Sequence, residues 1–473
     1  MKKDGFTGKI GFVLAAAGSA IGLGNIWRFP YLTAKYGGGI FLITYFVLVL
    51  TFGYSLLISE NCIGRMTRRG PIGAFRKLCP PDGSPLVRLL RHGGWIVSLV
   101  PMIILPYYCV IGGWVTKYVT VLLTHPASDF SQNRLVAGAG GELAPYSQVY
   151  FTDFIASPGE SLVYFAVFAL LLLAVASFGV QKGVERFNKI LMPLLFLMIA
   201  AICVYCCFLP DAGSGFRYYL MPEPEKFSFV TVVAAMGQLF FSLSLAMGIM
   251  ITYGSYMRRD EDLVSSVNQV EFFDTAIAFL CGLMIIPAVV AFGGREAAEN
   301  AGVGLVFITM PQVFANFPGG RFFGFLFFAL VLFAAATSAI SLLETNIQTV
   351  GQQLRIPRRK ALALCTAEIL IGGIPALLGY SVFARIRPLA WLERCRDMDI
   401  LDSMDFVSNS LLMPVAALLI TLLVLFAVGL KRFTAEIRRG AHWRRERLYR
   451  FCMTVLVIPC LLLILLYATG FIG

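Results

Sequence analysis

The sequence predicts an all-α polytopic membrane protein whose helices cross the bilayer about eleven times. Of its 473 residues, 58% are hydrophobic and only 14% are charged, and the mean hydropathy is +0.77. Apolar runs of about 20 residues, the length that a helix needs to span the hydrocarbon core, recur along the chain. They are centred near residues 22, 50, 108, 171, 199, 243, 280, 335, 370, 418 and 459.

The loops between the runs alternate in charge, which predicts the orientation in the membrane. Lys and Arg favour short cytoplasmic loops, and here they gather in residues 2–9, 65–91, 182–189, 258–259, 355–360 and 431–450. Residues 1–9 are polar and no cleavage pattern follows them. We therefore expect a cytoplasmic N-terminus, an extracytoplasmic C-terminus and location in the cell inner (plasma) membrane. Residues 385–396 depart from the rule, because their four arginines fall on the predicted outer side among acidic residues.

The composition also indicates which partners and which kinds of site the protein is expected to have. The net charge of +12 lies mainly in these short loops, so the expected partner is the lipid bilayer and not nucleic acid. The 11 Cys fall mostly inside apolar runs, and the 3 His are scattered through loops. We expect reduced, buried thiols, no metal site of Cys and His, and no enzyme active site.

The first apolar run contains an interruption. Residues 18–30, GSAIGLGNIWRFP, place three glycines, Asn25 and Arg28 inside it. In hydrocarbon, an opened backbone survives only where protein or a water-filled cavity surrounds it. Small and hydroxyl residues interrupt the sixth run in the same way at 240–248, FFSLSLAMG. Breaks at corresponding positions of two halves indicate a transporter built from inverted repeats.

The second break lies five runs after the first, an odd number, so the second half would enter the membrane upside down. The sequence therefore predicts one transmembrane transporter domain over residues 1–473, a 5+5 inverted repeat with unwound helices 1 and 6. Repeat one covers about residues 9–209, repeat two about 228–430, and a peripheral helix 11 about 447–470.

The half-helices at a break present opposite dipole ends, which attract a carboxylate and a cation, so a small zwitterion with Na⁺ would satisfy both. Thr337 and Ser338 in the eighth run offer hydroxyls that can complete a cation cage with the Gly18 and Ile21 carbonyls. The alternative is that both hydroxyls bond to their own helix. Asn25 either caps the second half-helix or binds the cation, and the two roles can coexist.

Several charged residues at membrane depth need partners. Asp274 opens the seventh run, where a carboxylate costs about 2.5 to 3.5 kcal/mol. We expect a cationic partner, and the alternative is a hydrated position near the cytoplasmic interface. Glu60 and Glu344 lie nearer helix ends, where snorkelling or a bond to backbone is at least as reasonable. Arg28 is expected to line an external vestibule and to pair with Asp405.

The outer connection at 295–321 carries the apolar sequence LVFITMPQVF between glycine-rich ends. This pattern predicts a short hairpin of helices that dips over the external vestibule. The alternative is an ordinary amphipathic surface loop.

Motifs shared with one known protein family occur along nearly the whole chain, in the same order as in that family. Residues 18–30 are followed by YGGG at 36–39, and then by residues 60–65, 107–108, 182–188, 237–245, 252–256, 311, 337–338 and 404–406. Together these resemble the neurotransmitter:sodium symporter family, specifically its shorter bacterial amino-acid transporters with eleven spans, such as those for leucine and for multiple hydrophobic amino acids.

The resemblance implies two Na⁺ sites and a substrate site. The first Na⁺ would be held by the Ala20 carbonyl, Asn25, Ser242, Asp274 and the substrate carboxylate. The second would be held by the carbonyls of Gly18, Ile21 and Ala334 and the hydroxyls of Thr337 and Ser338. The substrate would contact Ala20, Leu23, Gly24, Ile104, Tyr108, Phe241, Ser242, Ser244, Met247, Ser338 and Leu342. The apolar members of this set imply a hydrophobic or aromatic amino acid.

The resemblance also implies an outer and an inner gate. Outside, Phe241 and Tyr108 would close as an aromatic lid beneath the Arg28 and Asp405 pair. Inside, relatives join an N-terminal basic residue to an acid near the end of span eight.

This sequence departs from the family at the inner gate. Lys3 stands near the basic position, but Gln352 stands roughly where the acid is expected. Tyr256, with Ser255, is therefore expected to contribute more of the inner gate.

The seventh span can be aligned in two registers. Counting back from Gly282 puts Asp274 at the sodium-ligand position, whereas counting from Pro287 puts Phe273 there. Phe has no oxygen, so we take Asp274. Many animal relatives use chloride near this point, and because an acidic side chain would replace it, we expect transport without chloride.

The resemblance implies sodium-coupled symport of a hydrophobic or aromatic L-amino acid into the cell by alternating access, with a homodimer as one possible assembly. A proton-coupled transporter of similar fold, with Glu60, Asp274 or Glu344 as proton carrier, is the first alternative. A non-transporting amino-acid sensor and an ion channel are alternatives from other classes.

Overall fold

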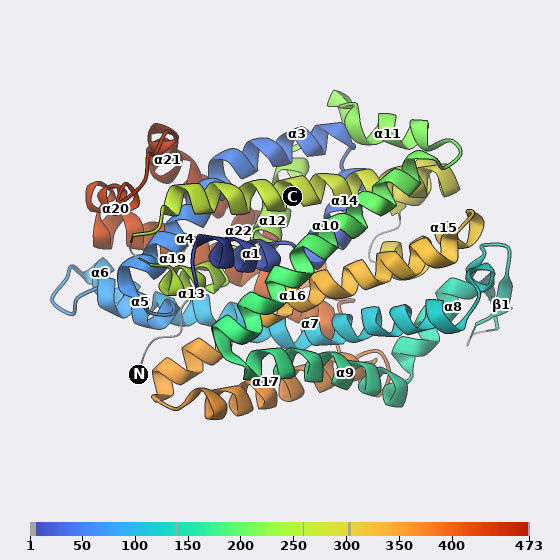
Figure 1. Ribbon diagram of the computed structural model, residues 1–473, viewed down its shortest axis with the longest axis horizontal. Helices are drawn as coiled ribbons and strands as arrows, with labels where there is room; N and C mark the ends of the chain where they lie inside the picture. The colour runs from blue at the N-terminus through green and yellow to red at the C-terminus, as the bar shows by residue number, and fades with distance from the viewer. Residues whose placement is uncertain (1–5, 139–140, 259, 301–303, 472–473) are drawn as a thin grey trace.

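A computed structural model describes residues 6–138, 141–258, 260–300 and 304–471, which form a layered bundle of helices elongated in one direction (Figure 1). Among the described residues, nine helices are long and apolar enough to cross a membrane, and a bent pair at the start of the chain makes ten. An eleventh span requires that two shorter helices, α12 (Phe229–Ser242) and α13 (Ile249–Tyr256), be counted as one, so the number eleven stays a prediction. The predicted all-α membrane class is confirmed.

The first half of the chain is mostly helical, with short π-helical or 3₁₀ segments labelled η. Its elements are α1 (Lys9–Ala20), η1 (Gly24–Arg28), α2 (Phe29–Lys35), α3 (Gly39–Leu48), η2 (Val49–Gly53), α4 (Tyr54–Thr67), α5 (Pro71–Leu78), α6 (Pro85–Leu90), α7 (Gly93–Thr124), η3 (Ala127–Phe130), β1 (Leu135–Ala137), β2 (Leu143–Pro145), α8 (Tyr146–Ala156), α9 (Pro158–Ser177), η4 (Val180–Glu185), α10 (Arg186–Cys207) and α11 (Ala212–Leu220). The two strands pair antiparallel.

The second half continues in the same manner. Its elements are η5 (Pro224–Lys226), α12 (Phe229–Ser242), α13 (Ile249–Tyr256), α14 (Leu263–Asn300), η6 (Leu305–Thr309), α15 (Met310–Asn316), α16 (Gly320–Leu354), α17 (Arg358–Leu378), η7 (Glu393–Cys395), α18 (Ile400–Asp405), η8 (Phe406–Leu412), α19 (Met413–Leu422), η9 (Leu423–Val428), α20 (Leu430–Ile437), α21 (Glu446–Phe451), η10 (Cys452–Leu456) and α22 (Val457–Ala468).

Helical structure stops at the two places where the sequence predicts breaks. After α1 the chain bends by 48° before it continues through η1 and α2. Between α12 and α13, Ser244, Ala246 and Gly248 have φ angles of 51°, 60° and 70°. Residues with a β-carbon avoid this left-handed region, so the helix cannot continue through it. A β-carbon on Gly248 would also lie only 2.5 Å from Cγ of Pro71.

Burial separates inner from outer helices. The apolar stretch of α16 is 83% buried and that of α7 is 78% buried, whereas α9, α17 and α22 are 33% buried there. The last three therefore present most of their apolar surface outward, as lipid-facing helices do. α16 packs against α7 and against α1, which sets the first break beside both inner helices.

The loops gather at two ends of the molecule. In Figure 1, α5, α6, α20 and α21 lie at one end, and α8, α11, α15 and β1 lie at the other. The 295–321 connection contains η6 and α15, short helical pieces as predicted. Phe307 of η6 packs edge-on against Trp27, with ring centroids 6.2 Å apart. This contact places the connection directly over the segment that follows the first break.

Candidate functional site

A cavity lies between the two helix breaks, with α7 and α16 completing its wall. Its lining residues are Ser19, Ala20, Gly22, Gly24, Ile104, Tyr108, Phe241, Ser244, Met247, Ile249, Ser338 and Leu342. The structure thus brings together all the predicted substrate residues except two. Leu23 lines the next cavity outward, and the Ser242 hydroxyl donates to Asp274.

Ser19, Gly22 and Ile249 line the cavity although the sequence analysis did not select them. Gly22 carries the clearest signal, because its missing side chain makes room for two hydroxyls. A β-carbon there would lie 2.3 Å from Ser338 Oγ and 3.0 Å from the Tyr108 hydroxyl. A glycine at the centre of a break can therefore be a wall residue as well as a point of flexibility.

The cavity wall is polar on one side and apolar on the other. At the first break, the Leu23 N–H donates to the Tyr108 hydroxyl at 3.2 Å. Ile104, Met247 and Leu342 form much of the apolar remainder. Such a wall suits a small amphipathic molecule whose polar end lies at the broken helices.

Asn25, Ser242 and Asp274 form a fully buried polar cluster next to this cavity. The Asn25 side-chain amide donates to Asp274 Oδ1 at 2.8 Å, and Ser242 Oγ donates to both carboxylate oxygens at 3.0 Å. Asn25 Oδ1 is buried without a hydrogen-bond partner in the described part of the chain. A carboxylate beside an unpartnered amide oxygen fits a hard cation such as Na⁺.

The same cluster answers two questions about Asp274. Of the two residues that the alternative registers offered, Asp274 is the one whose side chain meets Asn25. The carboxylate is buried, which excludes the alternative of a hydrated interfacial position. Within the described ranges, no Lys, Arg or His forms an ion pair with it. The cationic partner expected from the sequence is therefore not a described side chain.

The residues proposed for a second Na⁺ are only partly brought together. Ser338 Oγ donates to the Ser19 carbonyl at 2.9 Å and to the Ile21 carbonyl at 3.4 Å, which ties α16 to the first break. Thr337 instead donates to Ala334 of its own helix at 3.0 Å, the alternative that the sequence left open.

Gly18, also proposed for the second Na⁺, packs against α10. A β-carbon on Gly18 would lie 2.0 Å from Oδ1 of Asn188. That oxygen is buried and has no hydrogen-bond partner among the described residues.

A second cavity lies beside the central one, on the side that the sequence predicts to be the outer one. It is lined by Leu23, Trp27, Arg28, Tyr31, Tyr107, Tyr108, Ile111, Phe241, Leu401, Asp402 and Asp405. Tyr108 and Phe241 line both cavities, so these two rings form the wall between them, as expected for the lid.

Arg28 and Asp405 share the outer cavity but do not pair in this structure. The Asp405 carboxylate accepts from the Tyr107 hydroxyl at 3.0 Å and from the Asn409 amide. The Arg28 guanidinium lies over the Phe241 ring, with Cζ 5.7 Å from its centroid. The predicted ion pair is therefore not formed in this structure, because each residue contacts another partner.

The opposite side of the central cavity, predicted to be the inner one, is closed by aromatic packing and by an ion pair whose acid is buried. Phe6 packs edge-on against Tyr253 and Tyr256, with centroids 5.4 and 5.9 Å apart. The Tyr256 hydroxyl donates to Glu344 at 2.8 Å, and Arg358 donates to both oxygens of Glu344 at 2.9 and 2.5 Å.

The Arg358 to Glu344 pair was missed by the sequence analysis. A signal existed, since an acid inside an apolar run needs a cation and Arg358 begins the next helix. Of the residues predicted for the inner gate, Tyr256 bonds to Glu344, and Lys3 lies outside the described residues. Gln352 accepts from the Gly70 N–H at 3.1 Å.

Glu60 follows the backbone-bonded alternative. Its carboxylate is fully buried and accepts from the Ala246 N–H at 2.6 Å. It therefore supports the second break.

Comparison with known proteins places this arrangement in a family. The model of the "Sodium:neurotransmitter symporter family" matches residues 3–133 and 147–471. The uncharacterized sodium-dependent transporter YhdH of Bacillus subtilis is 33% identical over 457 residues, 96% of this chain and 95% of that protein. The human sodium- and chloride-dependent GABA transporter 2 is 25% identical over 486 residues, 96% of this chain and 77% of that protein. Among solved structures, MhsT in complex with L-phenylalanine matches with a TM-score of 0.84 and 32% identity, covering 98% of this chain and 100% of that chain.

Proposed function

This chain belongs to the sodium:neurotransmitter symporter family and is a sodium-dependent transporter, not an enzyme; from that premise we propose that it carries a hydrophobic or aromatic L-amino acid into the cell. The observation that carries the proposal is the two-sided wall of the central cavity, polar at Tyr108 and Ser338 and apolar at Ile104, Met247 and Leu342. The similar structure of MhsT holds L-phenylalanine, which supports the same class of ligand here.

Two Na⁺ ions would accompany the amino acid. The first would lie in the cluster of Asn25, Ser242 and Asp274, where an amide oxygen lacks a partner among the described residues. The second would lie at the Ser338 bridge to the carbonyls of the first break, with Gly18, Ala334 and Thr337 supplying further oxygens. Both positions touch the breaks, so ion binding would stabilise the conformation in which the substrate cavity is formed.

Transport would not need chloride. The buried Asp274 carboxylate supplies a negative charge beside the first Na⁺ position, the task that chloride would otherwise have. Relatives that are sodium- and chloride-dependent, such as human GABA transporter 2, make this a point where the family divides.

The protein would lie in the plasma membrane with the N-terminus inside and the C-terminus outside. In support, α5, α6, α20 and α21, which lie in or beside the basic segments 65–91 and 431–450, sit at one end of the bundle in Figure 1. Spans one to five and six to ten would form the two inverted repeats, and spans one, two, six and seven would move against the rest.

Labelled uptake of twenty amino acids into proteoliposomes tests the proposal. We expect saturable accumulation of apolar or aromatic amino acids under a Na⁺ gradient and none when choline replaces Na⁺. Uptake should continue when gluconate replaces chloride. Accumulation driven by a pH gradient in choline would contradict sodium coupling and favour the proton-coupled alternative.

A further inference from the structure

A second buried carboxylate lies on the same helix as Asp274. Glu271 precedes Asp274 by three residues in α14 and is only 4% exposed. Side chains three residues apart on a helix are neighbours, with β-carbons about 5 to 6 Å apart. The proposed first Na⁺ position therefore has two carboxylates within about one helical turn.

Arg445 is paired with this second carboxylate. Its Nη1 lies 2.7 Å from Oε2 of Glu271. Arg445 belongs to the connection between α20 and α21, which lie together at one end of the molecule in Figure 1. A cation from a loop thus reaches an acid that lies one turn from Asp274.

The Arg445 guanidinium is held in place by aromatic side chains. Its Cζ lies 4.8 Å from the centroid of the Tyr54 ring, and the Tyr54 hydroxyl accepts from Trp443 Nε1 at 2.9 Å. The Trp443 ring in turn packs against Tyr449, with centroids 5.0 Å apart. These contacts keep the positive charge next to Glu271.

The pair leaves one carboxylate oxygen without a partner. Glu271 Oε1 is buried and has no hydrogen-bond partner among the described residues. An ion pair that stabilises a fold is expected to have its remaining lone pairs satisfied as well. In buried surroundings charges act over longer distances than in water, so Glu271 and Arg445 both contribute to the electrostatic potential at the first Na⁺ position.

We propose that Glu271 and Arg445 set the Na⁺ affinity of the first position through their opposite charges, without contacting the ion. Glu271 strengthens Na⁺ binding, and Arg445 limits it so that the ion can leave again. This inference rests on the proposed function, because it takes Na⁺ to lie beside Asp274. A purely structural pair predicts a different result, since loss of either residue would loosen the packing and weaken Na⁺ binding.

Na⁺ titration of the purified protein in detergent tests the proposal. The readout is the Na⁺ concentration that gives half of the rise in melting temperature, with choline keeping the ionic strength constant, because an ion that binds the folded state raises this temperature. The titration is done at pH 8.5, where carboxyl groups lose their protons more readily. Arg445→Gln should lower this concentration at least threefold, and Glu271→Gln should raise it at least threefold.

The direction of the two shifts decides between the readings. Opposite shifts are expected for an electrostatic role, and the double variant Glu271→Gln with Arg445→Gln should lie between the two single variants. Shifts in the same direction, or no shift in either variant, would overturn the proposal. The melting temperature without Na⁺ reports separately on the stability that each variant loses.

One comparison remains informative if Arg445→Gln alone does not fold. Glu271→Gln and the double variant leave no buried carboxylate unpaired at this place. Their difference isolates the Arg445 charge, so the double variant should need at least threefold less Na⁺ than Glu271→Gln. Equal Na⁺ dependence of these two variants would overturn the role of Arg445.

Arg444→Gln is the neighbouring control. Arg444 is exposed and adjoins Arg445 in sequence, and its loss should leave the half-saturating Na⁺ concentration within twofold of wild type. A shift in this control as large as that in Arg445→Gln would show that the effect comes from net charge alone, and would overturn the proposal.

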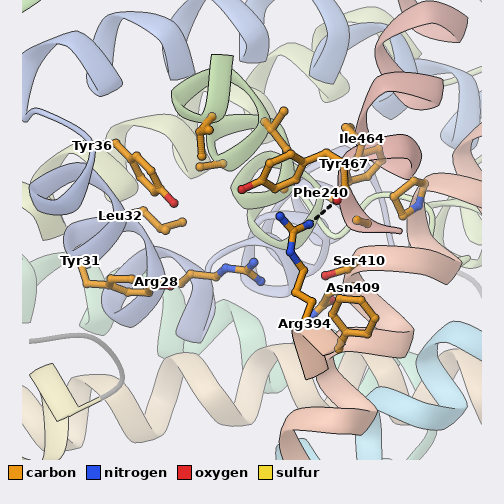
Figure 2. A pocket seen from close by; sticks show the side chains of 17 residues that line it. Arg28, Tyr31, Leu32, Tyr36, Phe240, Arg394, Asn409, Ser410, Ile464 and Tyr467 are labelled. Atoms are coloured by element: carbon orange, nitrogen blue, oxygen red, sulfur yellow. Dashed lines mark hydrogen bonds between the residues drawn. The ribbon is translucent and has the colours of Figure 1, made fainter. Parts of the chain in front are cut away.

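Arg394, on the predicted outer side, provides a distant control. Figure 2 shows its bond to the Tyr467 carbonyl as a dashed line, in a cavity that Arg28 also lines. None of the residues that line this cavity, all within the described chain, is Asp or Glu. Arg394→Gln therefore removes one positive charge without leaving a carboxylate unpaired, and it should also stay within twofold of wild type.

Asp274→Asn separates this inference from the proposed function. If Asp274→Asn leaves the Na⁺ titration unchanged, the first Na⁺ site of the proposed function is rejected. If Asp274→Asn weakens Na⁺ binding while the Glu271 and Arg445 variants titrate like wild type, that site stands and the present inference fails. In the Asp274→Asn background, Arg445→Gln should no longer shift the titration by more than twofold.

Discussion

Asn25 and Asp274 are single residues whose importance follows from their chemistry. Polar side chains are costly inside an apolar run, so each stands out in the sequence, and the structure brings both to one buried cluster with Ser242. Their identity could be predicted, but the unpartnered Asn25 oxygen could not, because it depends on the exact rotamers of residues about 250 positions apart in sequence. The Arg358 partner of Glu344 was missed although the sequence held a signal for it, an acid inside an apolar run with an arginine at the start of the next helix.

Replacing the carboxylate in this cluster tests its role as a cation ligand. Asp274→Asn keeps the shape and removes the charge, so the Na⁺ concentration for half-maximal uptake should rise at least tenfold, about 1.4 kcal/mol. Glu368→Gln is the matched control, because Glu368 is also an acid at membrane depth but bonds to Asn346 at 2.7 Å outside the cavity wall. Similar Na⁺ dependence in Asp274→Asn and wild type would reject the first Na⁺ site.

The Ser338 bridge is tested by removing one hydroxyl. Ser338→Ala loses both bonds to the first break, so sodium-stimulated uptake should fall at least tenfold while protein yield is retained. Thr345→Ala removes a buried hydroxyl of the same helix that bonds only within the helix, to Ser341 at 2.9 Å, and should transport normally. An equal loss in both variants would point to helix stability instead of ion binding.

At the scale of elements, the positions of both helix breaks could be predicted from the glycine and serine residues inside apolar runs. Their conformation did not, since Ser244 and Ala246 adopt left-handed φ angles that no local signal in the sequence announces. Tertiary contacts impose them, including the Glu60 bond to the Ala246 N–H. The short helices of the 295–321 connection were predictable from apolar spacing, but their contact with Trp27 depends on the fold.

A pair of substitutions tests the strained backbone of the second break. Gly248→Ala adds a β-carbon at φ 70° and 2.5 Å from Pro71, so it should destabilise the fold by about 1 to 2 kcal/mol or more. Ala246→Gly relieves a left-handed alanine and should leave the melting temperature nearly unchanged or higher. Thermal unfolding in detergent measures both, and a Gly248→Ala protein that melts like wild type would contradict this reading of the break.

At the scale of the whole molecule, the two sides of the central cavity are closed by different amounts of protein. Outward, the Tyr108 and Phe241 rings separate it from the next cavity, and Arg28 and Asp405 are apart. Inward, Phe6, Tyr253 and Tyr256 pack together beside the pair of Glu344 and Arg358. The sequence predicted that Arg28 and Asp405 pair, but the two are apart in this structure, because hydropathy carries no information on which conformation is more stable.

Weakening the closure around Glu344 should make the predicted inner side of the central cavity more accessible to solvent. Glu344→Gln removes the charge that holds Arg358 and Tyr256, so a reporter thiol at Ser255→Cys, buried in the closed form, should react with thiol reagents at least about threefold faster. The rate is compared with the same protein without the reporter, which accounts for native thiols. Glu393→Gln, an exposed outer residue, is the control, and unchanged reactivity in Glu344→Gln would show that the ion pair does not close the inner side.

The two closures of the central cavity differ in how many side chains form them, so the two sides are expected to open with different ease. In the proposed transport cycle, parting the Tyr108 and Phe241 rings would disturb fewer contacts than parting Phe6, Tyr253 and Tyr256 together with the Glu344 and Arg358 pair. We therefore expect the empty protein to open first on the side of the two rings, and the step that opens the other side to be the slower one.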